Sequence, residues 1–225
     1  MSAEPLSVRP IKIEGPFLLL VEGKDEVQFF LALLQHMGIE GVQVLDYAGK
    51  NKFPEFFPAV CLQLDPVRAY AVVRDADANA GHTLESIAGV LKKQGEPCPR
   101  RNKQFEIKRA HPRKVGVYVL PGDAEQGMLE DLCLSTVQDH PATDCVNVFM
   151  ECIERVLPKR PPDAVVTAGG QYYPKNRSKA RALAFLAAMH DEVHHVGEAA
   201  QGGCWDLDHP CLAELKAFLQ HLAGS

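Results

Sequence analysis

Acidic side chains follow two apolar segments of this sequence, at positions where carboxylates can do chemistry. Glu22 comes directly after the run 17–21, and Asp75 and Asp77 come at the end of the run 69–75. Each run is typical of a strand buried on both faces, because a strand covered by helices does not alternate polar and apolar residues. The carboxyl ends of parallel strands meet at one edge of an open sheet. We therefore expect these acids to lie together at that edge.

Glu26 is a further candidate for the same edge. Gly23 allows a tight turn, and apolar residues then recur at helical spacing, which places Glu26 one helical turn beyond Glu22. Crowded carboxylates repel one another unless a metal ion or a proton neutralises them, and oxygen ligands suit Mg²⁺. We expect a site for Mg²⁺ or Mn²⁺ that could activate a water and stabilise the leaving oxygen of a phosphodiester, with a nearby lysine offsetting charge.

The elements that must position these acids follow from hydrophobic periodicity and from glycine and proline breaks. Strands are predicted over 17–21, 42–47, 69–75 and 115–120, and the last could pair with 105–108 as a hairpin. Helices are predicted over 24–37, 53–64, 83–94, from 127 onward, over 145–156 and 179–189, and near the C-terminus after Asp208 and Pro210. Asn176 or Ser178 could cap the helix over 179–189, and Asp206 and Asp208 are interpreted as capping residues of the closing helix.

This order of elements predicts an α/β fold with a mostly parallel sheet, helices on both of its faces, and a C-terminal helical extension. We expect residues 1–190 to form the α/β domain, and 191–225 to form a C-terminal loop and helix packed on the same domain. No internal repeat or coiled-coil heptad is visible.

Composition narrows the classes of protein. With 225 residues and 46% apolar content the chain can bury a substantial core. Its apolar runs are too short for a bilayer and nothing resembles a signal peptide, so we expect a cytoplasmic protein without a membrane partner. Seven cysteines without a C-x-x-C pair favour reduced thiols over a disulfide framework or a zinc ribbon.

The distribution of charge leaves open whether the chain carries a surface for nucleic acid. The net charge of −5 argues against a protein coated in positive charge for non-specific DNA binding, although it allows a local basic strip. Residues 97–114 carry seven basic residues and one acid, Glu106, and are predicted to form an exposed basic excursion. Two interpretations remain: a solvated loop, or a track for a phosphate backbone.

A histidine cluster near residue 190 has a superficial zinc pattern. His190 and His194 stand four residues apart, as in a metalloprotease helix. That motif requires Glu directly after the first His, whereas Asp191 occupies the position here. We expect a surface cluster at a helix end.

At the level of motifs the chain resembles the TOPRIM domain shared by topoisomerases, primases and the OLD (overcoming lysogenization defect) nucleases. The match consists of Glu after a first strand, in Val21-Glu22-Gly23, and of Asp-x-Asp after a later one, Asp75-Ala76-Asp77. The phrases 21–26, 49–51 and 127–131 look most like OLD-type and small stand-alone TOPRIM-like bacterial proteins. The resemblance spans about residues 16–190.

The resemblance implies roles for individual residues. The OLD-type pattern implies metal ligation by Glu22, Glu26, Asp75, Asp77 and Glu130. It also implies a distal catalytic lysine beside the catalytic acids Glu22, Asp75 and Asp77, for which Lys179 is favoured and Lys175 is the competitor. Glu130 has an ordinary alternative, since acids in a first helical turn complement the helix dipole.

The resemblance therefore implies metal-dependent phosphodiester cleavage of nucleic acid. This sequence carries no G-x-x-x-x-G-K-[ST] phosphate loop, and a protein partner such as an ATPase is a possible expectation. The alternative is a non-catalytic metal- or nucleic-acid-binding module that acts with a partner in DNA repair or defence. Nucleotidyl transfer, as in TOPRIM primases, is a third possibility, but no primase zinc domain is visible.

Overall fold

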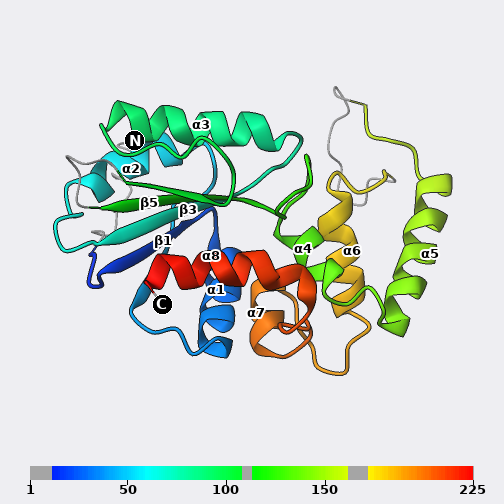
Figure 1. The fold of residues 1–225 in the computed structure, drawn as a ribbon. Helices are drawn as coiled ribbons and strands as arrows, with labels where there is room; N and C mark the ends of the chain where they lie inside the picture. The colour runs from blue at the N-terminus through cyan, green and yellow to red at the C-terminus, as the bar shows by residue number, and fades with distance from the viewer. Residues whose placement is uncertain (1–11, 108–112, 162–171, 225) are drawn as a thin grey trace, which may run out of the picture.

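A five-stranded sheet forms the centre of the molecule. The computed structural model describes residues 12–107, 113–161 and 172–224, and Figure 1 shows its fold. The strand order is β2-β1-β3-β5-β4, and all neighbours are parallel except the antiparallel pair β4 and β5. The strands are β1 Phe17–Val21, β2 Val42–Asp46, β3 Ala69–Asp75, β4 Gln104–Ile107 and β5 Lys114–Leu120.

Helices cover both faces of this sheet. The helices are α1 Lys24–His36, α2 Phe53–Cys61, α3 Ala80–Lys93, α4 Leu129–Ser135, α5 Pro141–Val156, α6 Arg177–Leu186, α7 Val196–Gln201 and α8 Ala213–Ala223, with a short 3₁₀ turn Pro210–Leu212 before α8. In Figure 1, α2 and α3 lie on one face, and α1 and α8 lie on the other. Helices α4, α5 and α6 gather beside the sheet, so the fold class predicted from the sequence is confirmed.

The apolar runs of the central strands serve two separate cores. In β1, Leu19 and Val21 face the core beneath α1 and α8, whereas Leu18 and Leu20 face the core beneath α2 and α3. Successive side chains of a strand point to opposite faces, so a strand between two cores must be apolar at every position. This explains why 17–21 reads as an unbroken apolar segment.

The strand order places a topological switch point between β1 and β3. Helix α1, which follows β1, packs on one face, and α2, which leads to β3, packs on the other. In open α/β sheets this arrangement leaves a crevice outside the carboxyl ends of the two strands, where ligands commonly bind. The residues that follow β1 and end β3 are the acids singled out in the sequence.

Local capping explains where the observed helices differ from the predicted ones. Helix α3 begins at Ala80, earlier than predicted, because the Asn79 side chain accepts a hydrogen bond from the His82 N–H at 2.8 Å. Capping of the closing helix by Asp206 or Asp208 is wrong: the residue that caps the turn before α8 is His209, whose Nδ1 accepts from the Cys211 N–H. The hairpin between β4 and β5 is present.

The C-terminal segment packs against the rest of the chain. Helix α8 lies against β3 and β5, and α7 lies against α1 within a stretch for which the sequence predicted no element. Residues 162–171, between α5 and α6, lie outside the described residues. Within the described ranges, no helix combines the length and the apolar character needed to cross a bilayer.

Candidate metal centre

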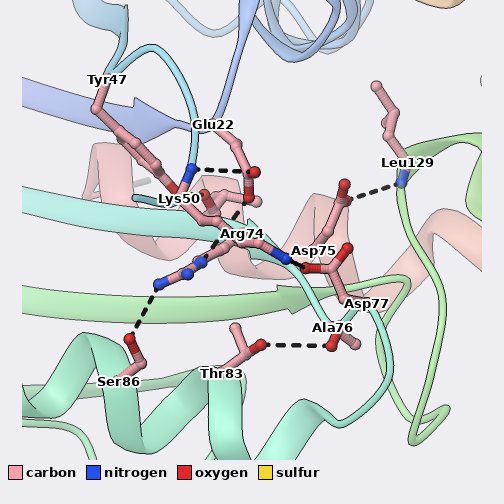
Figure 2. A network of polar contacts seen from close by, with 11 residues as sticks. Glu22, Tyr47, Lys50, Arg74, Asp75, Ala76, Asp77, Thr83, Ser86 and Leu129 are labelled. Carbon is pink, nitrogen blue, oxygen red and sulfur yellow. Dashed lines mark hydrogen bonds and ion pairs between the residues drawn. The ribbon is translucent and has the colours of Figure 1, made fainter. Parts of the chain in front are cut away.

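Strand pairing brings Glu22 and Asp75 to the same edge of the sheet. Leu20 lies opposite Val72 in the parallel pair β1 and β3, so Glu22 follows one strand at the level where the other ends in Arg74 and Asp75. Figure 2 shows both carboxylates at this edge, together with Asp77 and Lys50. The expectation that the acids after the two runs share one edge is met by this register.

Glu22 accepts one hydrogen bond and lacks a second. The Lys50 backbone N–H donates to Glu22 Oε1 at 3.1 Å. Glu22 Oε2 is buried without a hydrogen-bond partner in the described structure, and the buried Arg74 Nε lies 3.8 Å from it, beyond hydrogen-bond distance. Burial raises the pKa of Glu22, and the nearby Asp77 charge adds to the rise, whereas the Lys50 N–H and the Arg74 charge oppose it.

The two acids of the Asp-x-Asp motif have different surroundings. Asp75 Oδ1 accepts a hydrogen bond from the Leu129 N–H at 3.0 Å, which ties the end of β3 to the start of α4. Asp77 lies in a left-handed turn with φ of 52° and accepts an ion-paired hydrogen bond from Lys50 Nζ at 2.5 Å. Asp75 thus points toward α4, while Asp77 is neutralised by a lysine from the loop after β2.

Glu26 and Glu130 approach the same edge from two helices. Glu26 is in the first turn of α1, and Glu130, which is 7% exposed, is in the first turn of α4. Burial raises the pKa of Glu26 to about 7, and the charges of Glu22 and Glu130 add to this rise. Burial also raises the pKa of Glu130, which the Lys179 charge opposes.

These acids form one electrostatically coupled group, which we call the acidic edge, comprising Glu22, Glu26, Asp75, Asp77 and Glu130. Its centre is Asp75, whose pKa rises well above its usual range because of burial and then because of the charges of Glu26, Glu22 and Glu130. Acids from the ends of two strands and from two helices therefore oppose one another's ionisation. Perturbed carboxylates at the switch point of a sheet are typical of functional sites.

The acidic edge has the donor chemistry that Mg²⁺ or Mn²⁺ requires. Carboxylate oxygens are hard ligands, and the buried, unpartnered Glu22 Oε2 is an oxygen that a cation could satisfy. As placed, however, the described residues contain no group of three His, Cys, Asp or Glu side chains close enough to hold one ion together. The residue types and charges fit a metal ion. The five side chains lie at the same edge of the sheet, but no three of them are close enough together to bind one ion as placed.

The structure places the two candidate lysines differently. Lys179, in the first turns of α6, has its Nζ 4.0 Å from Glu130 Oε1 and is about half exposed. Lys175 precedes α6 and lines a basic hollow between the segment after α5 and the segment before α6. Lys179 is therefore the candidate lysine that pairs with an acid of the acidic edge.

Three residues of the site were not among the candidates. Lys50 contacts both Glu22 and Asp77, and Arg74 is buried beside Glu22. Asp25 adds negative charge that raises the pKa values of Glu26 and Glu130. A sequence signal existed for Arg74, since a cation inside a buried strand needs a local acid. Lys50 could have been found from its place in a glycine loop after β2.

The basic run over 97–114 is not a continuous exposed strip. Lys103 pairs with Asp123 at 2.5 Å and also contacts Glu214, and Arg113 pairs with Glu96 at 3.2 Å. Lys114 lies over the Phe105 ring and donates to a carbonyl of α8. The prediction of an exposed excursion is wrong for these three cations, because they anchor the β4–β5 hairpin; residues 108–112 lie outside the described ranges.

The two secondary candidates do not form a metal site in the described part of the chain. His190 and His194 are exposed beyond the end of α6, and the described residues contain no metal-holding group there. Asp208 Oδ1 contacts His36 at 2.8 Å and Lys216 at 3.2 Å, which links α1 to α8.

Comparisons with known proteins find one family model and two similar solved structures. The model of the family described as "Protein of unknown function (DUF3226)" matches residues 16–224. Two similar solved structures are C-terminal regions of OLD proteins, from Xanthomonas campestris pv. campestris (14% identity, 92% of this chain and 95% of that one, TM-score 0.42) and from Burkholderia pseudomallei (13% identity, 93% and 100%, TM-score 0.45). No curated protein sequence matches the chain.

Proposed function

We propose that this chain, which belongs to the DUF3226 family of proteins of unknown function, cleaves phosphodiester bonds in nucleic acid with Mg²⁺ or Mn²⁺ at its acidic edge. The observation that carries the proposal is the gathering of Glu22, Glu26, Asp75 and Glu130 at the carboxyl edge of the sheet, where the buried Glu22 Oε2 has no hydrogen-bond partner in the described structure. Burial and mutual charge also raise the pKa values of these acids. Four partly buried carboxylates that oppose one another's ionisation are a costly arrangement for a purely structural edge. The TOPRIM-like motif order supports the same interpretation.

The residues divide into ligands and charge-balancing groups. Glu22, Asp75 and Asp77 would hold the ion, and Glu26 and Glu130 would complete the carboxylate set. When bound, such an ion supplies a water of lowered pKa and stabilises negative charge on the phosphoryl oxygens. Hydrogen bonds from the backbone N–H groups of Lys50 and Leu129 fix Glu22 and Asp75 before the ion arrives.

Lys179 is suited to act on the substrate. Its ammonium is half exposed and close to Glu130, so it can turn toward a phosphate at the acidic edge. There it would offset charge on the reacting phosphate, as positioned cations do in phosphoryl transfer. Lys175 remains the competing residue for this role.

Cleavage assays test the proposal directly. Supercoiled plasmid and single-stranded oligonucleotides are incubated with Mg²⁺ or Mn²⁺ and with wild type, Glu22→Gln or Asp75→Asn. Loss of a metal ligand is expected to lower the cleavage rate by about 100-fold or more, as loss of one group that stabilises transition-state charge does in other enzymes.

A matched control is available on α3, outside the acidic edge. Glu85 is an exposed acid of α3, so Glu85→Gln removes the same charge outside the acidic edge and should leave cleavage unchanged. Thermal unfolding of each variant establishes that it folds. Equal activity of wild type, Glu22→Gln and Asp75→Asn would sink the proposal.

One observation favours a second candidate, a non-catalytic module that acts with a partner such as an ATPase. Lys50 and Arg74 already place two positive charges beside Asp77 and Glu22. In that case the charges of Lys50 and Arg74, rather than a metal ion, would balance the negative charge of the acidic edge. Calorimetry separates the two functions: Mg²⁺ or Mn²⁺ binding that is lost in Asp75→Asn supports the nuclease, and absence of binding to the wild-type chain supports the module.

A further inference from the structure

A basic and aromatic hollow lies beside α6, away from the β4–β5 hairpin. It has a volume of about 740 Å³ and lies between the segment that leaves α5 and the segment that enters α6. Its lining includes four cations and two aromatic rings, namely Lys159, Arg160, Tyr172, Tyr173, Lys175 and Arg177. Among the described residues, the lining contains no acid, although the chain as a whole has a net charge of −5. We propose that this hollow binds single-stranded nucleic acid and leads it to the acidic edge.

Local contacts hold the two sides of the hollow together. The Tyr173 N–H donates to the Pro158 carbonyl at 3.0 Å, which joins the segment after α5 to the segment before α6. Arg177 Nη1 lies 3.5 Å from Glu154 Oε2, so α6 is tied to α5 as well. The tyrosines therefore lie on a braced surface between two packed helices.

The side chains match the chemistry of an unpaired strand. Lys159 and Lys175 are exposed, and their ammonium groups can contact successive phosphates. Tyr172 is half-buried, so its ring is supported by the protein and can stack on a base. The Tyr173 hydroxyl is buried without a hydrogen-bond partner in the described structure and could bond to a ligand's polar edge. Duplex bases are stacked inside the helix, so stacking favours single strands.

Helix α6 connects the hollow to the acidic edge. Asn176 caps α6 through a hydrogen bond from the Lys179 N–H, and its Nδ2 lies 3.2 Å from Met128 Sδ, next to α4. One turn further along, Lys179 approaches Glu130. A strand held by Lys175 would thus pass Lys179 before it reaches the acids. The direction of this path rests on the proposed function, whereas binding to the hollow does not.

The test measures binding without cleavage. A fluorescein-labelled oligo(dT) 20-mer is titrated with the full chain in EDTA, and anisotropy is recorded at several salt concentrations. Tyr172→Ala is expected to weaken binding about tenfold through lost stacking. Lys175→Ala should weaken it severalfold and lower the slope of log affinity against log salt by about one. An oligo(U) arm distinguishes RNA from DNA.

Two controls make the result specific to the hollow. Lys92→Ala with Lys93→Ala removes two exposed cations from α3, on the other face of the sheet, and should leave affinity unchanged. Glu85→Gln, which removes an exposed charge outside both the hollow and the acidic edge, should bind the oligonucleotide as wild type does. Lys175 is exposed, so its variant tests the hollow even if Tyr172→Ala fails to fold.

The other outcomes overturn either this inference or the proposed function. Unchanged affinity in Lys175→Ala, an equal loss in the α3 control, or equal affinity for a duplex of the same length would exclude a single-strand site here. Displacement of the oligonucleotide by polyglutamate at matched charge would reduce the hollow to a general anion surface. A chain that binds through the hollow and cleaves nothing would leave this inference standing and remove the proposed nuclease.

Discussion

The two ends of the parallel sheet bury carboxylates in opposite ways. At the amino end, Glu96 is 3% exposed, pairs with Arg113 at 3.2 Å, and accepts a hydrogen bond from the Tyr70 hydroxyl at 3.1 Å. At the carboxyl end, Asp75 has one backbone donor and like charges around it. The buried charge of Glu96 is balanced by the Arg113 cation and the Tyr70 hydroxyl. At the acidic edge, by contrast, several negative charges lie close together.

This difference shows which end is organised for folding and which for chemistry. Arg113 also donates to the Leu64 carbonyl, so the amino-end pair joins α2, α3 and the start of β5. The acids of the carboxyl end raise one another's pKa values and so lower the stability of the folded chain at neutral pH. Groups of side chains that lower the stability of the folded protein in this way are typical of functional sites.

The largest expected effect comes from breaking the compensated end. Arg113→Met removes the cation that pairs with the buried Glu96 at 3.2 Å and should lower the free energy of unfolding by about 3–5 kcal/mol. Urea unfolding followed by circular dichroism measures the change. The double variant Arg113→Met with Glu96→Gln should recover part of the loss, because no buried charge then remains. A single-variant loss of less than about 1 kcal/mol would contradict the contrast between the two ends.

Charge removal at the carboxyl end should have the opposite sign. Glu26→Gln removes an acid whose pKa is raised to about 7, so it relieves repulsion and should raise the free energy of unfolding by on the order of 1 kcal/mol at pH 8. Metal-dependent cleavage should fall in the same variant. The exposed Glu85→Gln serves as the neutral control for both measurements. A destabilised Glu26→Gln would mean that this acid is structural.

The sequence was sufficient to predict the scaffold and the acids that follow its strands. Apolar runs predicted β1, β3 and the neighbourhood of Glu22 and Asp75, because strands between two cores have no polar alternation. Arg74 is the charged exception within the apolar run 69–75, so it could be singled out from the sequence. The C-terminal layer was harder, since α7 is short and its place depends on packing against α1 rather than on periodicity.

Charge pairing was the part that the sequence could not predict. Lys103, Arg113 and Lys114 are close in sequence and looked like one basic strip, yet each has a partner distant along the chain, as Lys103 has in Glu214. Conversely, the cations of the hollow come from two segments separated along the chain. Which cations remain for a ligand depends on tertiary contacts that composition does not encode.

The pH dependence of stability sharpens the comparison further. The pKa of Glu26 is raised to about 7 and that of Asp75 is also raised, so the folded chain binds more protons than the unfolded chain above about pH 4.5. Unfolding then releases protons, and stability should fall as pH rises through about 7. Melting temperatures in EDTA between pH 5 and 8 measure this slope. Glu26→Gln should flatten it, and the exposed Glu85→Gln should leave it unchanged.

The smallest expected effect concerns Lys50, whose ammonium pairs with Asp77 in a partly exposed position. Exposed ion pairs contribute little, so Lys50→Met should change the free energy of unfolding by less than about 1 kcal/mol. Its effect on the acidic edge is a different matter, because the variant removes a positive charge that competes with a bound cation. Calorimetry should therefore find Mg²⁺ affinity raised severalfold, while Lys52→Met, in the same loop and paired with Glu55, should leave it unchanged. Weaker Mg²⁺ binding in Lys50→Met would show instead that Lys50 positions Glu22 and Asp77 for the ion.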